Sequence, residues 1–172
     1  MKQIGAVDRN WGIGYGGNLL QRIPEDIARF RKMTLNKVVV MGRETFLSLP
    51  KQEPLKNRVN IVLSRNPDFV NDRVTVCRSL EELFTELKQY DTDDVFVIGG
   101  GAVYALLLPY CTEAYLTKID NAYPADTYYP NLDTEDGWEL VSESEPMGYG
   151  DIGYRYTVYA HQKPKQYDEE RT

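Results

Sequence analysis

The sequence has 172 residues and a formal net charge of −6, with 42% hydrophobic and 27% charged residues. This composition predicts one soluble domain that is large enough to bury a core. The negative charge argues against a nucleic acid or an anionic membrane surface as the partner, because either one requires a basic surface. No apolar segment is long enough to predict a membrane-spanning helix.

The chain enters a strand pattern within two residues of Met1, so we expect no signal peptide and a cytoplasmic protein. We also expect a monomer, because no unusually apolar surface helix requires a partner. Cys77 and Cys111 each lie in an apolar, strand-like setting without a partner motif. We therefore interpret both as small core residues and expect neither a disulfide framework nor a metal site.

Strand and helix patterns alternate along most of the chain, which predicts a mostly parallel sheet. The strand patterns cover residues 3–7, 37–41, 59–63, 74–77, 94–98 and 114–119, and the helical patterns cover about 25–34, 44–48, 80–88 and 102–108. Two later strand patterns, near 138–144 and 154–162, predict an antiparallel hairpin at the sheet edge, joined by residues 146–150. The predicted architecture is an α/β fold with a central sheet of about eight strands and about four flanking helices.

We expect a single domain over residues 1–162, followed by a solvated tail over 163–172 that is polar, charged and without hydrophobic periodicity. Ser79 is well placed to cap the helix that begins at residue 80. His161, the only histidine, is expected on the solvent side of the last strand.

A buried-type strand runs directly into Gly99, Gly100 and Gly101 and then into a helical pattern. Glycines let a backbone approach a ligand, and the amides at the start of the next helix favour an anion. A tight strand-to-helix turn that needs glycine only for its geometry explains the run equally well. The contiguous triplet does not match the G-x-G-x-x-G dinucleotide fingerprint, so a nucleotide site here would have another design.

The segment over residues 8–23 is longer than a connector requires and contains four glycines. Long glycine-bearing loops in compact domains are usually functional lids or disordered segments. The loop also has apolar side chains with which to pack, at Trp11, Ile13, Leu19 and Leu20. These residues favour a lid over a flexible surface excursion.

The helix after this loop carries a carboxylate on its apolar stripe. Asp26 shares the i, i+3, i+4, i+7 spacing with Ile23, Ile27, Phe30, Met33 and Thr34. Desolvation there would raise the pKa of Asp26, which a fold tolerates when the group binds a ligand or moves a proton. The alternative is an ordinary first-turn acid that interacts with helix amides, since Pro24 suits the first helical position. Geometry alone favours this alternative.

Several sequence blocks, taken together and in order, resemble the dihydrofolate reductase family. They are 7–14 (VDRNWGIG), 23–26 (IPED) with Phe30, 40–46 (VMGRETF), 58–64 (RVNIVLS), 97–101 (VIGGG) with Tyr104, and 116–120 (LTKID). The resemblance extends from Ile4 to about residue 160. It implies NADPH-dependent reduction of 7,8-dihydrofolate to tetrahydrofolate, by hydride transfer to pterin C6 and protonation at N5. It also implies a role in one-carbon metabolism and in thymidylate and purine synthesis, and binding of antifolate inhibitors.

The resemblance assigns Asp26 to the carboxylate that hydrogen-bonds the pterin 2-amino group and N3, with the proton reaching N5 through water. Thr117 would contact the same carboxylate and pterin edge, and Arg58 would clamp the α-carboxylate of the substrate. The resemblance further implies a pterin and aminobenzoyl pocket lined by Ile4, Ala6, Ile27, Phe30, Leu49 and Ile98.

For the cofactor NADPH, the resemblance implies a 2′-phosphate cluster of Arg43, Ser64 and Arg65, with Arg78 a weaker candidate. Thr45 and the segment Gly100, Gly101 and Ala102 would hold the pyrophosphate, Ala6 and Ile13 would lie beside the nicotinamide, and Tyr104 would lie near the hydride path. The other residues expected at the cofactor are Gly14, Gly42, Glu44, Leu63, Ile98, Gly99 and Val103. The resemblance also implies a cis peptide bond between Gly99 and Gly100.

Two positions depart from the family pattern. Family lids usually read Leu-Pro-Trp or Leu-Leu-Trp, whereas this chain has Gln21 after two leucines. The tryptophan that shields the site and orders a water near the acid is therefore missing, and Gln21 becomes the candidate to hold that water. Ala102 replaces a basic or other polar residue of some relatives, and we expect this change to reduce only cofactor affinity.

Two alternative functions remain at this point. A pyrimidine reductase of riboflavin synthesis shares the general fold and cofactor, but it would not need the combination of Pro24, Glu25, Asp26 and Arg58. The Gln21 departure also allows a catalytically weak protein that binds NADPH or folate.

Overall fold

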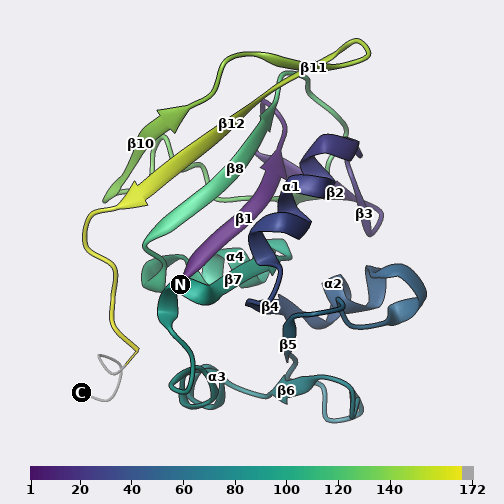
Figure 1. Cartoon of the computed structure of the whole chain (residues 1–172), viewed down its shortest axis with the longest axis vertical. Helices are drawn as coiled ribbons and strands as arrows, with labels where there is room; N and C mark the ends of the chain where they lie inside the picture. The colour runs from purple at the N-terminus through teal and green to yellow at the C-terminus, as the bar shows by residue number, and fades with distance from the viewer. Residues whose placement is uncertain (168–172) are drawn as a thin grey trace.

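A computed structural model describes residues 1–167, and its core is one large mixed sheet. The strands are β1 (Lys2–Val7), β4 (Val38–Gly42), β5 (Val59–Leu63), β6 (Thr75–Cys77), β7 (Val95–Gly99), β8 (Glu113–Ile119), β10 (Trp138–Glu143), β11 (Met147–Tyr149) and β12 (Ile152–His161). They form a nine-stranded sheet in the order β10-β12-β8-β1-β7-β4-β5-β6, with β11 paired to β12 (Figure 1). The predicted α/β fold and strand patterns are confirmed, with boundaries that differ by at most two residues.

Neighbouring strands pair in parallel along the stretch β8-β1-β7-β4-β5-β6 of this order. At the β8 side, β12 pairs antiparallel with β8, and β10 pairs antiparallel with β12. The hydrophobic run in β4 explains its central place, because Val38, Val39 and Val40 are each no more than 3% exposed. Both faces of such a strand must be covered. Since the strands are parallel, their carboxyl ends lie along one edge of the sheet, where connections to helices begin.

Four α-helices connect these strands: α1 (Pro24–Thr34), α2 (Arg43–Ser48), α3 (Leu80–Leu87) and α4 (Gly101–Leu107). Short 3₁₀ turns follow or precede them at Pro50–Gln52, Thr92–Asp94 and Leu108–Tyr110. The predicted cap is confirmed, since the Ser79 hydroxyl accepts a hydrogen bond from the Glu82 amide at 3.1 Å. Figure 1 shows α1 in front of β1, on one face of the sheet.

The predicted lid segment is not an irregular loop throughout. It contains β2 (Gly12–Tyr15) and β3 (Asn18–Leu19), and β2 also pairs with β9 (Thr127–Tyr128). These three strands form a second, antiparallel sheet. The segment 8–23 is thus attached to β9, which is distant in sequence. Its strands depend on this distant partner, so the local sequence pattern does not predict them.

Two residues near the end of the chain, His161 and Tyr167, are less exposed than expected. His161 is half-buried, because its ring stacks on Trp138 at 4.7 Å and its Nδ1 lies 3.0 Å from the Cys111 carbonyl oxygen. Tyr167, in the predicted solvated tail, stacks on Phe84 of α3 at 4.9 Å between ring centroids. The rest of that tail, 168–172, lies outside the described residues.

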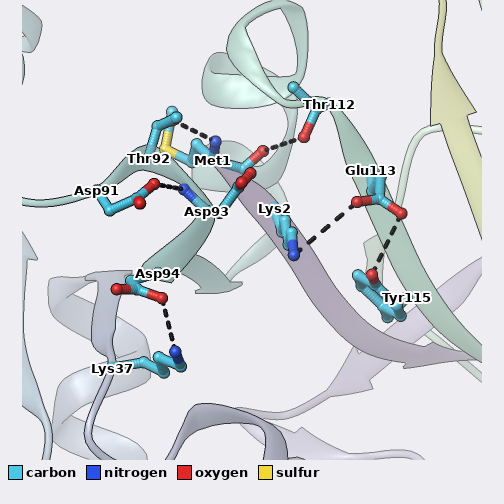
Figure 2. Close-up of polar contacts among 10 residues, drawn as sticks. All are labelled: Met1, Lys2, Lys37, Asp91, Thr92, Asp93, Asp94, Thr112, Glu113 and Tyr115. Carbon is cyan, nitrogen blue, oxygen red and sulfur yellow. Dashed lines mark hydrogen bonds and ion pairs between the residues drawn. The ribbon is translucent and has the colours of Figure 1, made fainter.

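Charged groups at the amino end of the sheet contact neighbouring charged or polar groups (Figure 2). The Met1 ammonium donates to the Thr92 hydroxyl at 2.6 Å, and Lys37 Nζ lies 2.6 Å from an Asp94 carboxylate oxygen. Lys2 Nζ lies 3.9 Å from Glu113 Oε1. The residues expected at a phosphate, Arg43, Ser64 and Gly100, follow the carboxyl ends of β4, β5 and β7, at the opposite edge of the sheet from this cluster. Arg58 instead comes directly before β5, at the amino end of that strand.

The buried polar side chain of Gln3 joins β1 to two tyrosines from later in the chain, Tyr104 and Tyr129. Gln3 is fully buried, its amide nitrogen donates to the Tyr104 carbonyl oxygen at 2.9 Å, and its amide oxygen accepts from the Tyr129 hydroxyl. Tyr129 follows β9, and its backbone amide donates to the Trp11 carbonyl oxygen at 2.7 Å. The Gln3–Tyr129 contact therefore ties the small sheet to the large one.

We predict that Tyr129→Phe lowers the free energy of unfolding by about 1–3 kcal/mol, because the Gln3 amide oxygen loses its donor inside the core. Urea unfolding followed by circular dichroism measures the change. Tyr128→Phe is the matched control, since Tyr128 is 52% exposed and its loss should cost less than about 0.5 kcal/mol. An equal loss in both variants would contradict the prediction.

Candidate functional site

The helix α1 is attached at its two ends to strands that are far apart in the sheet. Near its start, the Asp26 carboxylate accepts a hydrogen bond from the Thr117 hydroxyl in β8 at 2.5 Å. At its end, the Thr34 hydroxyl accepts from Arg58 Nε at 3.0 Å, immediately before β5. Because β1, β7 and β4 lie between β8 and β5, the helix crosses the face of the sheet above them.

Asp26 does not act as a helix cap. No side chain caps the start of α1, and the carboxylate instead points to Thr117, which is 1% exposed. Burial raises the pKa of Asp26 above its usual value, while the Thr117 hydrogen bond and the charge of Arg29 act in the opposite direction. Asp26 is therefore a desolvated carboxylate with one fixed hydrogen bond and remaining acceptor capacity.

Arg58 is held at the other end of α1 by three hydrogen bonds. Besides Nε to Thr34, its terminal nitrogens donate to the carbonyl oxygens of Lys56 and Arg31, at 2.9 and 3.2 Å. Burial, and next the charge of Arg31, lowers the pKa of Arg58. A guanidinium has five N–H donors, so two remain after these three bonds, which is the number that one carboxylate accepts in a bidentate pair.

The apolar stripe of α1 is only partly covered. Ile27 is 37% exposed and Phe30 is half-buried, so these side chains are not the closed core that the helical spacing alone suggests. Leu49, at the end of α2, and Ile98, in β7, are also half-buried, whereas Ile4 is only 5% exposed. Asp26 and Thr34 are eight residues apart on α1, or about 12 Å along its axis. Apolar side chains thus separate an acid from an arginine by a distance that suits an elongated ligand.

Gly99 and Gly100 lie against Thr45 near the start of α2, whereas Gly101 lies against Thr127 and Tyr128. Gly99 has a φ of 129°, in the region that favours glycine, and the peptide bond between Gly99 and Gly100 is cis, as expected. A side-chain carbon on Gly100 would lie 3.4 Å from the Thr45 hydroxyl oxygen. The Cγ2 of Val103 in α4 approaches Gly42 so closely that a side-chain carbon there would meet it at 3.0 Å. The residues expected around a pyrophosphate are therefore brought together by the adjacent strands β4 and β7.

The basic residues expected around a 2′-phosphate also follow neighbouring strands. Gly42 pairs with Leu63 and Leu63 pairs with Cys77, so Arg43, Ser64 and Arg78 come directly after three adjacent strand ends. Arg43 is half-buried and forms an ion pair with Glu44 at 2.8 Å, and Arg65 is exposed. The Arg78 guanidinium instead holds the loop after β5, because it donates to the carbonyl oxygens of Ser64, Asn66 and Phe69.

The remaining expected residues connect the two halves of the site. Ala6 in β1 pairs directly with Thr117 in β8, and a side-chain carbon on Gly101 would lie 3.8 Å from Ile13 Cδ1. Gly14 pairs with Leu19 and Thr127 within the small sheet, and Ala102 is exposed on α4. The buried Tyr104 hydroxyl donates to the Ile4 carbonyl oxygen at 2.7 Å, which fixes α4 against β1.

Sequence reasoning missed two carboxylates that hold the lid. Asp8 is 3% exposed, and its oxygens accept backbone hydrogen bonds from Asn10, Gly12 and Tyr123 at 2.8–2.9 Å. Asp126 accepts from the Gly16 amide at 2.9 Å. The Asp8-x-Asn-x-Gly spacing indicates a local turn. The contact of Asp8 with Tyr123 and the contact of Asp126 with Gly16 join residues that are far apart in sequence, so they depend on the fold.

Gln21 lies near the end of the lid segment, three residues before α1 begins at Pro24. Its amide nitrogen donates to the Arg22 carbonyl oxygen at 3.2 Å, and its amide oxygen lies 3.5 Å from the Tyr123 hydroxyl, which donates to it. Both side chains are half-buried. Gln21 is therefore polar, partly accessible and fixed to the segment that follows β8.

Across residues 1–167, no three His, Cys, Asp or Glu side chains are grouped closely enough to hold a metal ion. Within the same residues, no helix has the length and apolar character needed to cross a membrane.

Comparisons with known proteins agree with this geometry. The family model for dihydrofolate reductase matches residues 1–163. The chain belongs to the dihydrofolate reductase family. Dihydrofolate reductase from Mycobacterium tuberculosis is 41% identical over 155 residues, which cover 88% of this chain and 90% of that protein. The enzyme from Bacillus subtilis is 35% identical over 160 residues, which cover 93% and 92% of the two chains.

A solved structure extends the agreement to three dimensions. Dihydrofolate reductase from Enterococcus faecalis, complexed with NADP(H) and RAB-propyl, superimposes with a TM-score of 0.83 at 32% sequence identity. The match covers 94% of this chain and 96% of that chain. As a dihydrofolate reductase, the chain is an NADP-dependent oxidoreductase that reduces dihydrofolate to tetrahydrofolate, and NADPH is its cofactor.

We predict that Asp26→Asn makes the dihydrofolate reductase more stable at pH 7. The pKa of Asp26 in the folded protein lies above 3.8, so the folded state binds more protons between pH 3.8 and the raised pKa. The contribution of Asp26 to stability therefore falls as the pH rises through that window, and it stays low above it. Urea unfolding should show a stability gain at pH 7 that disappears near pH 4.

The control for this experiment is Asp68→Asn, which removes one negative charge from an exposed position. It should show no comparable gain. If Asp26→Asn is no more stable than the unmodified protein at pH 7, the burial of Asp26 carries no energetic cost and the prediction is wrong.

Proposed function

We propose that the groups on and around α1 form the substrate site of this dihydrofolate reductase. The observation that carries the proposal is the placement of Asp26 and Arg58 at opposite ends of one apolar helix stripe. Dihydrofolate has a matching order of groups, with an N–H donor edge on the pterin, an aromatic middle and a carboxylate end. Ile27, Phe30, Leu49 and Ile98 then contact the middle of the substrate, together with Ile4 and Ala6 from β1.

Asp26 orients the pterin by accepting hydrogen bonds from its 2-amino group and N3. A desolvated carboxylate makes such charge-assisted bonds stronger than an exposed one would. Thr117 donates to Oδ1 of Asp26 and so directs the other carboxylate lone pairs toward the ligand. NADPH, when bound, supplies the hydride that reduces C6 of the pterin.

Protonation at N5 requires a water that the protein orders near Asp26. Gln21 and the Tyr123 hydroxyl, which contact each other at the lid, are the polar groups proposed to hold that water. Tyr104 acts through β1, because its hydroxyl fixes the Ile4 carbonyl group beside the site. No protein side chain transfers hydride, so the residues supply orientation and electrostatics.

Most of the proposed cofactor residues follow the carboxyl edge of the large sheet, and Ile13 and Gly14 join them from β2 of the small sheet. Thr45 and the backbone of Gly100, Gly101 and Ala102 bind the pyrophosphate, and Ala6 with Ile13 contacts the nicotinamide. Gly14, Gly42, Glu44, Leu63, Ile98, Gly99, Val103 and Tyr104 complete the proposed set. Arg43, Ser64 and Arg65 bind the 2′-phosphate, and Arg78 positions the loop that carries Ser64. This fit depends on the absence of a side chain at Gly100, where a Cβ would lie 3.4 Å from the Thr45 hydroxyl oxygen.

We further propose a cytoplasmic monomer that binds antifolates at the Asp26 site. Two buried free cysteines fit a reducing compartment, and the exposed large hydrophobic residues are scattered along the chain. The net charge of −6 supports neither nucleic acid nor an anionic membrane as a partner. The one-domain boundary at residue 162 remains a prediction.

We predict that the purified protein oxidises NADPH only when dihydrofolate is present, and that Asp26→Asn lowers kcat/KM at pH 7 by about 100-fold or more. The loss of NADPH absorbance measures both. A pyrimidine substrate of riboflavin synthesis, assayed in parallel, should produce no oxidation. The proposal would be overturned if the unmodified protein did not oxidise NADPH in the presence of dihydrofolate.

The Gln21→Trp variant, measured in the same assay, separates a weak catalyst from a binding protein. An enzyme that already turns over should retain activity in this variant, because the tryptophan fills the same lid position. Saturable NADPH binding without turnover in either protein would instead support a non-catalytic function.

We predict that Arg65→Gln raises the KM for NADPH by about tenfold and leaves the KM for NADH unchanged, because only NADPH carries the 2′-phosphate. Arg73→Gln is the matched control, since Arg73 is exposed in the same connection between β5 and β6 but is not in the proposed cluster. Steady-state kinetics with both cofactors tests this assignment. A parallel change in both KM values would contradict it.

A further inference from the structure

Arg29 lies one helical turn after Asp26, on the same side of α1. Residues three positions apart on a helix have Cβ atoms about 5–6 Å apart. The Arg29 guanidinium carbon lies 4.0 Å from the centroid of the Tyr156 ring in β12. This cation–π contact fixes the charge of a half-buried arginine beside the helix turn that carries the proposed substrate carboxylate.

Tyr156 is itself fixed next to the partner of Asp26. In the register between β12 and β8, Tyr156 pairs with Thr117, whose hydroxyl donates to Asp26. The Tyr156 ring also meets the ring of Tyr154 edge-on at 5.6 Å. The buried Tyr154 hydroxyl donates to the Glu25 carboxylate at 2.8 Å, which attaches the same turn of α1 to β12.

The contact with Tyr156 keeps Arg29 away from the Asp26 carboxylate. Among the ion pairs of residues 1–167, none joins Arg29 to Asp26, although a salt bridge at this spacing is common on helices. The charge of Arg29 nevertheless favours the ionised form and lowers the pKa of Asp26, against the larger effect of burial. Arg29 thus acts through space and leaves the carboxylate oxygens accessible to a ligand.

The other titratable groups around Asp26 do not replace this effect. Tyr104 from α4 and Tyr156 from β12 have their pKa raised by burial, so both are neutral near pH 7. Burial also raises the pKa of Tyr115 on β8 and of Tyr154 on β12, so both side chains remain neutral. Glu25, on α1, is negative when ionised and opposes ionisation of a nearby carboxyl. Arg29 is the positive charge in this set.

We propose that Arg29, stacked on Tyr156, is a positioning residue that maintains the negative charge of Asp26 without contacting that carboxylate. The inference deepens the proposed function and rests on it, since Asp26 is the group that would receive the pterin. A direct salt bridge would occupy the oxygens that the pterin needs. A stacked arginine supplies the charge and leaves those oxygens available.

The test measures the Asp26 pKa in the free protein, without substrate or cofactor. The ¹³C carboxyl resonance of Asp26, assigned by its absence in Asp26→Asn, is followed as a function of pH. Arg29→Met should move the midpoint upward by about 0.5–1 pH unit, and Arg29→Gln should do the same. Arg29→Lys keeps the charge and should stay within about 0.3 unit of the unmodified protein.

Lys32→Met is the matched control, because it removes one positive charge from an exposed position of the same helix that is six residues after Asp26 and so on a different side of the helix from that carboxylate. It should leave the midpoint unchanged. The shift in Arg29→Met should also shrink between low and high salt, as expected for a partly solvated charge. No shift in either neutral variant, or an equal shift in Lys32→Met, would overturn the proposal.

The pH profile of dihydrofolate-dependent NADPH oxidation provides the second measurement. Its midpoint should move upward in Arg29→Met by the same amount as the resonance, whichever protonation state the reaction requires. A purely structural role for Arg29 would change kcat or stability but would not move this midpoint. If the resonance shifts and the unmodified protein shows no activity, the role of Arg29 holds and the proposed reaction fails.

Discussion

The placement of α1 is the constraint on which the rest of the site depends. Two side-chain hydrogen bonds, Thr117 to Asp26 and Arg58 to Thr34, attach the ends of this helix to strands separated by three others. Because the helix is rigid between them, its apolar stripe is held over the sheet without being pressed into the core. The fold therefore leaves the side chains of Ile27 and Phe30 partly uncovered on this stripe.

This arrangement has an energetic cost at Asp26. A carboxylate in a half-buried position loses hydration, and one hydroxyl does not replace it. Two interactions partly offset this cost, because the Thr117 hydrogen bond and the charge of Arg29 both stabilise the ionised carboxylate. Destabilised groups at functional sites are a general consequence of selecting for binding as well as stability.

Local pattern was enough to predict the main sheet and its helices. The strand at residues 59–63 has the predicted boundaries, because four of its five residues are β-branched or aliphatic and polar residues flank it on both sides, a composition typical of a strand. The strands β3 and β9 have two residues each and pair across the chain, so they leave no periodic signal. Asp26 was recognisable as unusual from its stripe, but only the contact with Thr117 separates a buried acid from a capping one. Arg29 and Asp8 could not be assigned, because their partners Tyr156 and Tyr123 lie far away in sequence.

The three hydrogen bonds that hold Arg58 have one more consequence. An arginine side chain normally loses much rotational freedom when a ligand immobilises it, and that loss weakens binding. Here the guanidinium is already fixed by Thr34 and two backbone carbonyl groups, so the freedom is lost when the chain folds. A carboxylate that binds at this end of α1 therefore contacts an arginine that is already ordered. Binding then costs less side-chain entropy than it would with a mobile arginine.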